Sequence, residues 1–104
     1  MIQWGALHIT MDNEEARSLL REELAKYRGM RYEELRALVN APKRVSEVVG
    51  PSGTHYYIDV YAAWEGWRNG DVRVMGRIDD GAWRAFVPLA EGFVRTPTGD
   101  TFQA

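Results

Sequence analysis

The sequence contains no cysteine and only two histidines among its 104 residues. The absence of cysteine excludes disulfides, thiolate nucleophiles and every zinc site that uses sulfur ligands. His8 and His55 are distant in the sequence, and on one strand His55 and Asp59 would stand about 13 Å apart, too far to share an ion. We therefore expect no metal site and no cofactor.

The chain also lacks a strong net charge and a long apolar run. Its formal net charge is -2, so no overall positive field attracts nucleic acid or an anionic membrane. No apolar segment approaches the roughly 20 residues that a transmembrane helix requires. The start of the chain lacks the basic residues and the cleavage site of a signal peptide. These features predict a soluble cytoplasmic protein without a membrane partner.

Recognisable catalytic motifs are absent as well. Ser18, Ser46 and Ser52 stand in no nucleophile elbow, and neither histidine is spaced to activate them. Acidic pairs occur, but on helices such pairs are typical of solvated faces. The segment 50–53 (Gly-Pro-Ser-Gly) lacks the lysine and the following helix of a phosphate-binding loop. We expect a protein that is not an enzyme and has no catalytic residue.

What the chain does contain is period-two alternation of apolar residues over 54–87, which predicts strands at 54–64, 71–78 and 83–87. A weaker first strand, placed at an edge, is predicted at 43–49. Asp80-Gly81 favours a two-residue hairpin turn. That turn would place Ile78 opposite Trp83, Arg77 opposite Arg84 and Met75 opposite Phe86. A short last strand is predicted at 93–95, followed by a turn and a tail that Phe102 anchors.

Helical spacing of apolar residues predicts two helices before the strands, at 12–28 and 31–39. Gly29 is expected to end the first helix in a left-handed conformation. The expected fold is an α+β domain over 11–104, with two helices on one face of a four- to five-stranded antiparallel sheet (order α-α-β-β-β-β). Residues 1–10 are expected to be an extension. Either translation begins at Met11 or the extension is a short strand or frayed tail.

The core is predicted from the mainly apolar residues at every second position of the strands. Its members are Tyr56, Ile58, Val60, Ala62, Trp64, Val74, Gly76, Ile78, Trp83, Ala85 and Val87. Gly76, which has no side chain, leaves room for a neighbouring ring or a helix. The helices are expected to lie on this set.

The opposite parity forms an open face that is rich in aromatic residues and arginine. Its predicted binding residues are Tyr57, Tyr61, Arg73, Arg77, Arg84 and Phe86. One interpretation is a solvated surface, in which Asp59 lies opposite Arg77 and neutralises the like-charged pair that Arg77 forms with Arg84. The other is a platform for protein association, because exposed aromatics and arginine are enriched at interfaces.

The function that follows is a non-enzymatic interaction module whose partner is another protein or a second copy in a homodimer. The alternative is weak binding of single-stranded nucleic acid, with tyrosines stacked on bases and arginines on phosphates. The slightly acidic chain makes nucleic acid the less favoured partner. Trp67 is either a further anchor on its loop or folded back over the edge of the core.

Several segments together resemble small bacterial proteins of unknown function. They are 57–60 (Tyr-Ile-Asp-Val), Trp64, 72–74 (Val-Arg-Val), 78–81 (Ile-Asp-Asp-Gly), 88–89 (Pro-Leu), 93–94 (Phe-Val) and 99–102 (Gly-Asp-Thr-Phe). The resemblance covers about residues 27–102. It implies an α+β domain of bacterial origin and supplies no catalytic residue.

Overall fold

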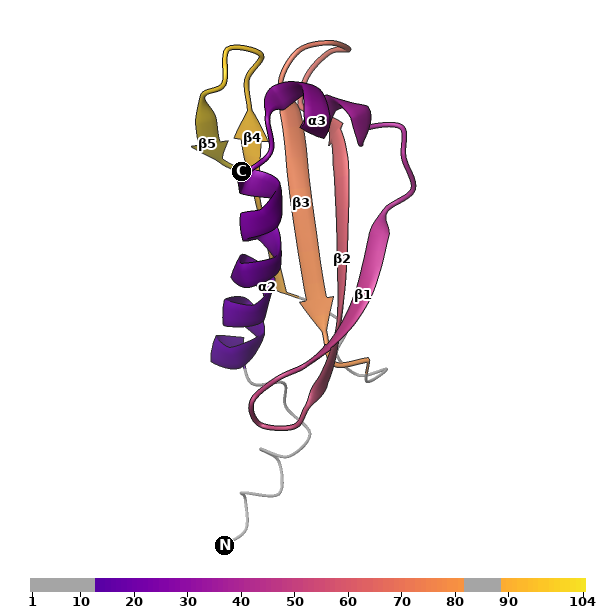
Figure 1. Ribbon diagram of the computed structural model, residues 1–104, viewed down its shortest axis with the longest axis vertical. Helices are drawn as coiled ribbons and strands as arrows, with labels where there is room; N and C mark the ends of the chain where they lie inside the picture. Colours follow the sequence, from indigo (N-terminus) through magenta and orange to yellow (C-terminus); the bar gives the residue numbers. More distant parts are fainter. Residues whose placement is uncertain (1–12, 82–88) are drawn as a thin grey trace, which may run out of the picture.

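The computed structural model describes residues 13–81 and 89–104 and has two helices followed by a five-stranded antiparallel sheet (Figure 1). The elements are α2 (Asn13–Arg28), α3 (Tyr32–Ala37), β1 (Arg44–Val49), β2 (His55–Trp64), β3 (Val72–Asp79), β4 (Leu89–Arg95) and β5 (Thr101–Gln103). Each strand pairs with the next one along the chain, so β1 and β5 are the edges. The predicted α+β class and the edge position of the first strand are confirmed. The predicted extension 1–10 lies outside the described residues.

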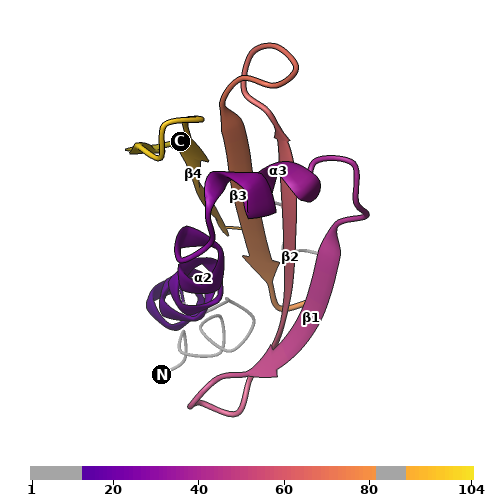
Figure 2. The same cartoon turned by 45° about the horizontal axis from the view of Figure 1, so that its top comes forward.

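Both helices lie on the same face of the sheet (Figures 1 and 2). α2 runs along β3 and β4, and α3 lies over one end of β2 and β3. The predicted helical stripe of Ala16, Leu20, Leu24 and Tyr27 is buried. A Cβ on Gly76 would lie 2.9 Å from Leu20 Cδ1. The missing side chain of Gly76 therefore gives α2 its close approach, as predicted.

The core lies between the helices and the middle strands. Its fully buried strand residues include Tyr56, Ile58, Val72, Val74, Ile78 and Phe93. Most of the predicted core set is buried, and Trp64 is partly buried against it. The predicted core residues Trp83, Ala85 and Val87 lie outside the described residues.

The predicted partner of β3 is wrong. β3 pairs with β4, so that Ile78 lies opposite Leu89, Arg77 opposite Ala90 and Met75 opposite Gly92, rather than opposite Trp83, Arg84 and Phe86. This register places the fully buried Phe93 opposite Val74 under α2. Phe93 is thereby a fully buried member of the core.

The chain after β3 also differs from the prediction in its turns and strand lengths. Gly81 has the left-handed φ of +79° that the expected turn needs, but the strand that pairs with β3 begins at Leu89. The short strand predicted at 93–95 is the end of the longer β4, and β5 forms where a tail was expected. Hydrogen-bonded pairing with β4 therefore holds the C-terminal residues in the sheet.

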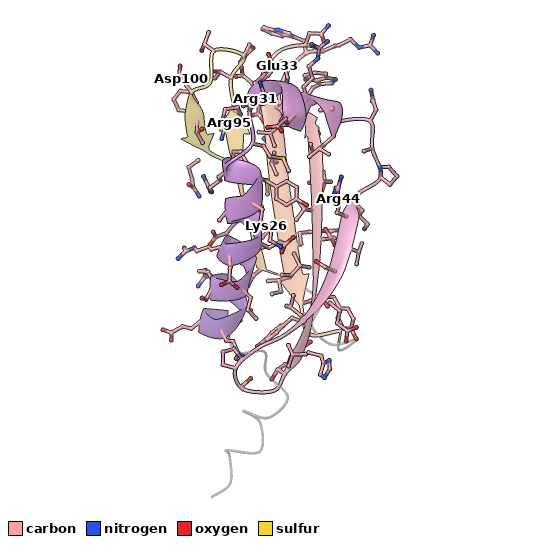
Figure 3. All side chains as sticks on the ribbon, viewed as in Figure 1. Lys26, Arg31, Glu33, Arg44, Arg95 and Asp100 are labelled. Carbon is pink, nitrogen blue, oxygen red and sulfur yellow. The ribbon has the colours of Figure 1, made fainter. Side chains whose placement is uncertain are left out.

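The end of α2 is formed differently from the expectation as well. Gly29 does not have a left-handed φ. Instead, Arg95 of β4, which is only 7% exposed, donates from Nη2 to the Arg28 carbonyl at 2.9 Å and from Nη1 to the Met30 carbonyl at 2.5 Å. Figure 3 labels Arg95 near this junction of helix and sheet. A strand side chain thus satisfies the last carbonyl of α2, which has no partner within the helix, and one carbonyl of the segment that follows it.

Candidate functional site

The face of the sheet opposite the helices carries most of the exposed large apolar side chains in the described part of the chain. The register places five of them there, namely Val45 and Val49 on β1, Tyr57 and Tyr61 on β2, and Phe102 on β5. Val45 is 63% exposed and Phe102 58%. The whole sheet face opposite the helices, which also carries Asp59, Arg73, Met75 and Arg77, is called the open face below.

The arginines of the open face are held in ion pairs. Arg77 lies directly opposite Asp59, as predicted, and its Nε and Nη2 donate to the two carboxylate oxygens at 3.0 and 3.1 Å. Arg73 donates in the same way to Glu65, at 2.6 and 3.1 Å. These hydrogen bonds raise the pKa of both guanidinium groups, and the Arg73 contact lowers the pKa of Glu65. The charges are therefore neutralised within the surface.

Two glycines fix the orientation of side chains on this surface. Gly92 lies opposite Met75, and a Cβ on it would overlap Met75 Sδ and the Val74 carbonyl oxygen. A Cβ on Gly81 would lie 2.7 Å from Tyr57 Cε2. The Met75 thioether and the Tyr57 ring thus pack on bare backbone.

The predicted site residues have different outcomes in the structure. Tyr57, Tyr61, Arg73 and Arg77 share one face, whereas Arg84 and Phe86 lie outside the described residues. Val45, Val49 and Phe102 were not predicted as binding residues. The alternation of valines in β1 was the only signal for the first two, and none marked Phe102 as part of a strand.

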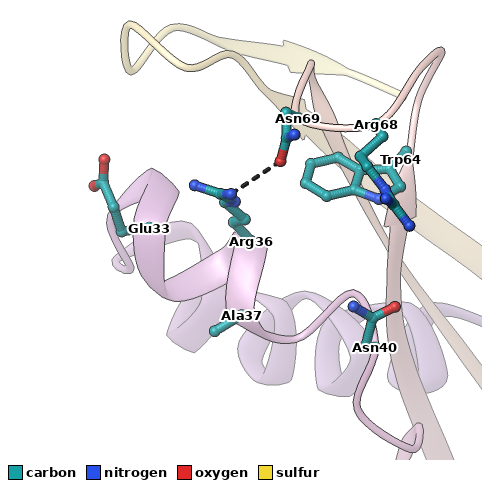
Figure 4. Close-up of a pocket in the computed structure, with 7 residues that line it drawn as sticks. All are labelled: Glu33, Arg36, Ala37, Asn40, Trp64, Arg68 and Asn69. Atoms are coloured by element: carbon teal, nitrogen blue, oxygen red, sulfur yellow. Dashed lines mark hydrogen bonds between the residues drawn. The ribbon is translucent and has the colours of Figure 1, made fainter.

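The loop between β2 and β3 is fixed to α3 and borders an open hollow of about 550 Å³ (Figure 4). Tyr32 donates from its hydroxyl to the Gly70 carbonyl at 2.6 Å, and Arg36 donates to Asn69 Oδ1 at 2.9 Å. Arg68 and Trp64 also line the hollow. Its lining residues include no serine, threonine, cysteine or histidine.

Trp67 stands at the tip of the same loop. Its side chain is 81% exposed, so the interpretation in which it folds back over the core is wrong. It lies beside a smaller hollow, of about 160 Å³, and not in the larger one.

A polar cluster joins α2 to the turn between β1 and β2. Glu15 accepts hydrogen bonds from the Tyr56 hydroxyl at 2.7 Å, from Ser52 Oγ at 2.7 Å and from the Ser52 amide at 2.8 Å. These bonds, with that of Tyr56 the largest cause, lower the pKa of Glu15. The cluster fixes the helix start to the hairpin.

Within residues 13–81 and 89–104, no group of three or more acidic, histidine or cysteine side chains is arranged to hold a metal ion. Among the same residues, no helix is long and apolar enough to cross a membrane. Comparison of the chain with protein-family models, with curated proteins and with solved structures finds no match. Function is therefore inferred from the geometry of the molecule, and the resemblance to small bacterial proteins stays a prediction.

Proposed function

We propose that this protein is a non-enzymatic interaction module that binds another protein through the open face. The observation that carries the proposal is that five of the six exposed large apolar side chains among the described residues lie on the one sheet face that no described helix covers. Scattered exposed apolar residues are normal, but a grouped set is typical of an interaction site.

The ion pairs define the kind of partner. Asp59 and Glu65 already neutralise Arg77 and Arg73, so a partner needs no opposite charge to bind there. It gains free energy mainly by covering Val45, Tyr61 and their neighbours, which favours a partner with an apolar, weakly charged surface.

The same ion pairs count against single-stranded nucleic acid. A phosphate would have to displace a bidentate carboxylate from Arg73 or Arg77, and doing so would leave an acid close to the phosphate. Nucleic acid is therefore not proposed as a partner of the open face.

Site-specific photo-crosslinking tests this proposal. A benzophenone amino acid is placed at Tyr61 or Phe102 on the open face, or at Ser18, which is exposed on α2. In cells that make the protein naturally, we expect the same protein adduct from Tyr61 and Phe102 but not from Ser18. The adduct should persist after nuclease treatment and at high salt.

Competition supplies the control. Excess wild-type protein should suppress the adduct, whereas a Tyr61→Thr, Phe102→Ser double variant should not, because it keeps the backbone and removes apolar surface. Equal adducts from Ser18, or no protein adduct from either open-face position, would contradict the proposal.

A further inference from the structure

The two edges of the sheet differ sharply. β5 pairs over only three residues, and short edge strands resist pairing with other chains. β1 pairs over six residues in an unbroken register, without a bulge, from Arg44 to Val49. Its sequence, Arg-Val-Ser-Glu-Val-Val, contains no proline or glycine, and its two charges cancel. Of the devices that normally protect an edge, β1 therefore has only the charged side chains of Arg44 and Glu47, with no proline, no bulge and more than a very short length.

No described element covers this edge. Both helices lie over the other strands, and β1 forms one side of the sheet in both views (Figures 1 and 2). The turn after β1 contacts α2 through Ser52 and Glu15. Five of its six residues are exposed, with Val49 exposed to 56%. The outer side of β1 is therefore accessible to a further strand.

The hairpin identifies which backbone groups point outward. The Gly50 amide donates to the Thr54 carbonyl at 2.8 Å, so Gly50 and Thr54 form a hydrogen-bonded pair. Because such pairs alternate along an antiparallel ladder, the even-numbered residues of β1 bond to β2. The N–H and C=O groups of Val45, Glu47 and Val49 then point away from the sheet and are available to another strand.

We propose that β1 pairs antiparallel with β1 of a second copy, which joins two sheets into one continuous sheet around a two-fold axis. A two-fold axis perpendicular to the sheet keeps each side chain on its own face. Because side chains alternate between the two faces along a strand, two residues that lie opposite each other must both be odd-numbered or both be even-numbered. Odd-numbered residues of one copy therefore lie opposite odd-numbered residues of the other. The outward groups of β1 lie on these odd-numbered residues, so the strand is geometrically complementary to itself.

Charge and strand length select the register. A register centred on Glu47 places two like charges directly opposite each other, which is destabilising. A register centred on Val45 places Val49 beyond the end of β1 of the second copy, so Val49 has no partner residue in that strand. Centring on Ser46 places Val45 opposite Glu47 of the second copy and Lys43 opposite Val49. Lys43 then lies diagonal to Glu47 of the second copy, within reach of its long side chain.

The short β5 also explains why the proposed assembly would stop at two copies. A head-to-tail contact between β1 and β5 would propagate into a fibre, whereas β1 with β1 ends at two copies. The difference between the edges therefore predicts a closed dimer.

The absence of cysteine permits a direct test by disulfide trapping. In the proposed register Ser46 faces itself in a non-hydrogen-bonded pair, where Cα atoms are about 4.5 Å apart, within the range of roughly 4.4–6.8 Å that a disulfide spans. A Ser46→Cys variant should form a covalent dimer in oxidised glutathione. Ser18→Cys, on exposed α2, is the matched control. We expect at least about tenfold faster linkage at Ser46, because the effective concentration within a dimer is on the order of millimolar.

Two further cysteines test the register. Val45→Cys and Glu47→Cys report pairing centred on those residues, and both should link more slowly than Ser46→Cys. Linkage at Ser46 no faster than at Ser18, or fastest at Val45 or Glu47, would overturn the proposal.

Sedimentation equilibrium provides a test without cysteine. The mass measured for the wild-type chain should approach twice 11.9 kDa with increasing concentration. Glu47→Pro removes an outward N–H and no backbone bond to β2, together with the exposed contact of its carboxylate with His55 Nδ1. It should be monomeric with an unchanged circular dichroism spectrum, whereas Glu47→Gln should remain dimeric. A wild-type monomer at all concentrations, or a dimer that survives Glu47→Pro, would overturn the inference. Tyr61→Thr, Phe102→Ser should still dimerise, so this result is independent of the proposed open-face function.

Discussion

Replacing Arg95 by methionine tests the role of the buried guanidinium most directly. Its three hydrogen bonds reach the carbonyls of Arg28 and Met30 and the Thr101 hydroxyl at 2.7 Å. A hydrogen bond from a charged donor contributes about 1.5 kcal/mol at the low end. Water that reaches the released carbonyls offsets part of this, so we expect a loss of about 3 kcal/mol in the free energy of unfolding. For a domain of this size, that lowers Tm by about 12 °C or more.

Urea unfolding followed by circular dichroism measures this loss, with the slope m checked for constancy between variants. Methionine preserves much of the apolar stem, so lost packing contributes little. Arg95→Lys keeps the charge but not the fork of donors and should fall between wild type and Arg95→Met. Arg68→Met, at an exposed position on the β2–β3 loop, is the matched control and should change stability by no more than about 0.5 kcal/mol. If Arg95→Met were within 1 kcal/mol of wild type, the assignment of Arg95 as the cap of α2 would be refuted.

Three further predictions concern the glycines, Glu15 and Trp67. Gly92→Ala should destabilise the protein by about 1–3 kcal/mol and by more than Gly76→Ala, because its Cβ meets the Val74 carbonyl oxygen whereas that of Gly76 meets leucine side chains; the reverse order in urea unfolding would contradict the packing described here. Hydrogen bonds lower the pKa of Glu15 from its ordinary value of 4.5, so its stabilisation is complete above that value and is lost as pH falls through the lowered pKa. Glu15→Gln should therefore lose less stability than wild type between about pH 5 and pH 3, and parallel pH profiles would exclude the effect. Trp67→Ser should change stability by less than about 0.5 kcal/mol, and a larger loss in thermal unfolding would show that the ring packs on the domain.

Local patterns in the sequence predicted the elements whose apolar residues repeat without interruption. The stripe of Leu20 and Leu24 on α2 and the alternation of Tyr56, Ile58 and Val60 on β2 needed no tertiary information. The same alternation put Asp59 and Arg77 on one face and restricted β2 and β3 to registers in which paired residue numbers have an even sum. One of these registers places Asp59 opposite Arg77, and the structure has that register.

The prediction placed the strand that pairs with β3 at 83–87 instead of at Leu89–Arg95. The reason is that the helix-facing positions of β4 are not all apolar. Leu89, Glu91, Phe93 and Arg95 share that face, and two of them are charged. Both charges have partners elsewhere in the chain: Arg21 Nε lies 3.0 Å from Glu91 Oε1, and Arg95 caps α2. Period-two analysis interprets such a segment as a loop, and only the packed helix shows why the charges are tolerated.

The way in which α2 ends was not predicted either, because it also depends on a contact between residues that are distant in the sequence. Gly29 matched the local signal for a left-handed cap, but the carbonyls near it are satisfied by a side chain that is distant in the sequence. The open face was predicted in part, since Tyr57 and Tyr61 lie on a strongly alternating strand. Phe102 belongs to a strand of three residues, too short for a periodic signal.

The edge and the open face are compatible in one assembly. A two-fold axis perpendicular to the sheet leaves the helices of both copies on one side and places their open faces next to each other on the other side. Edge pairing therefore leaves the open face accessible and doubles it, whereas a dimer packed face to face would bury it. A partner with two matching surfaces would then bind the dimer with the gain that two linked contacts provide, and Glu47→Pro should weaken that binding while the affinity of each single face stays the same.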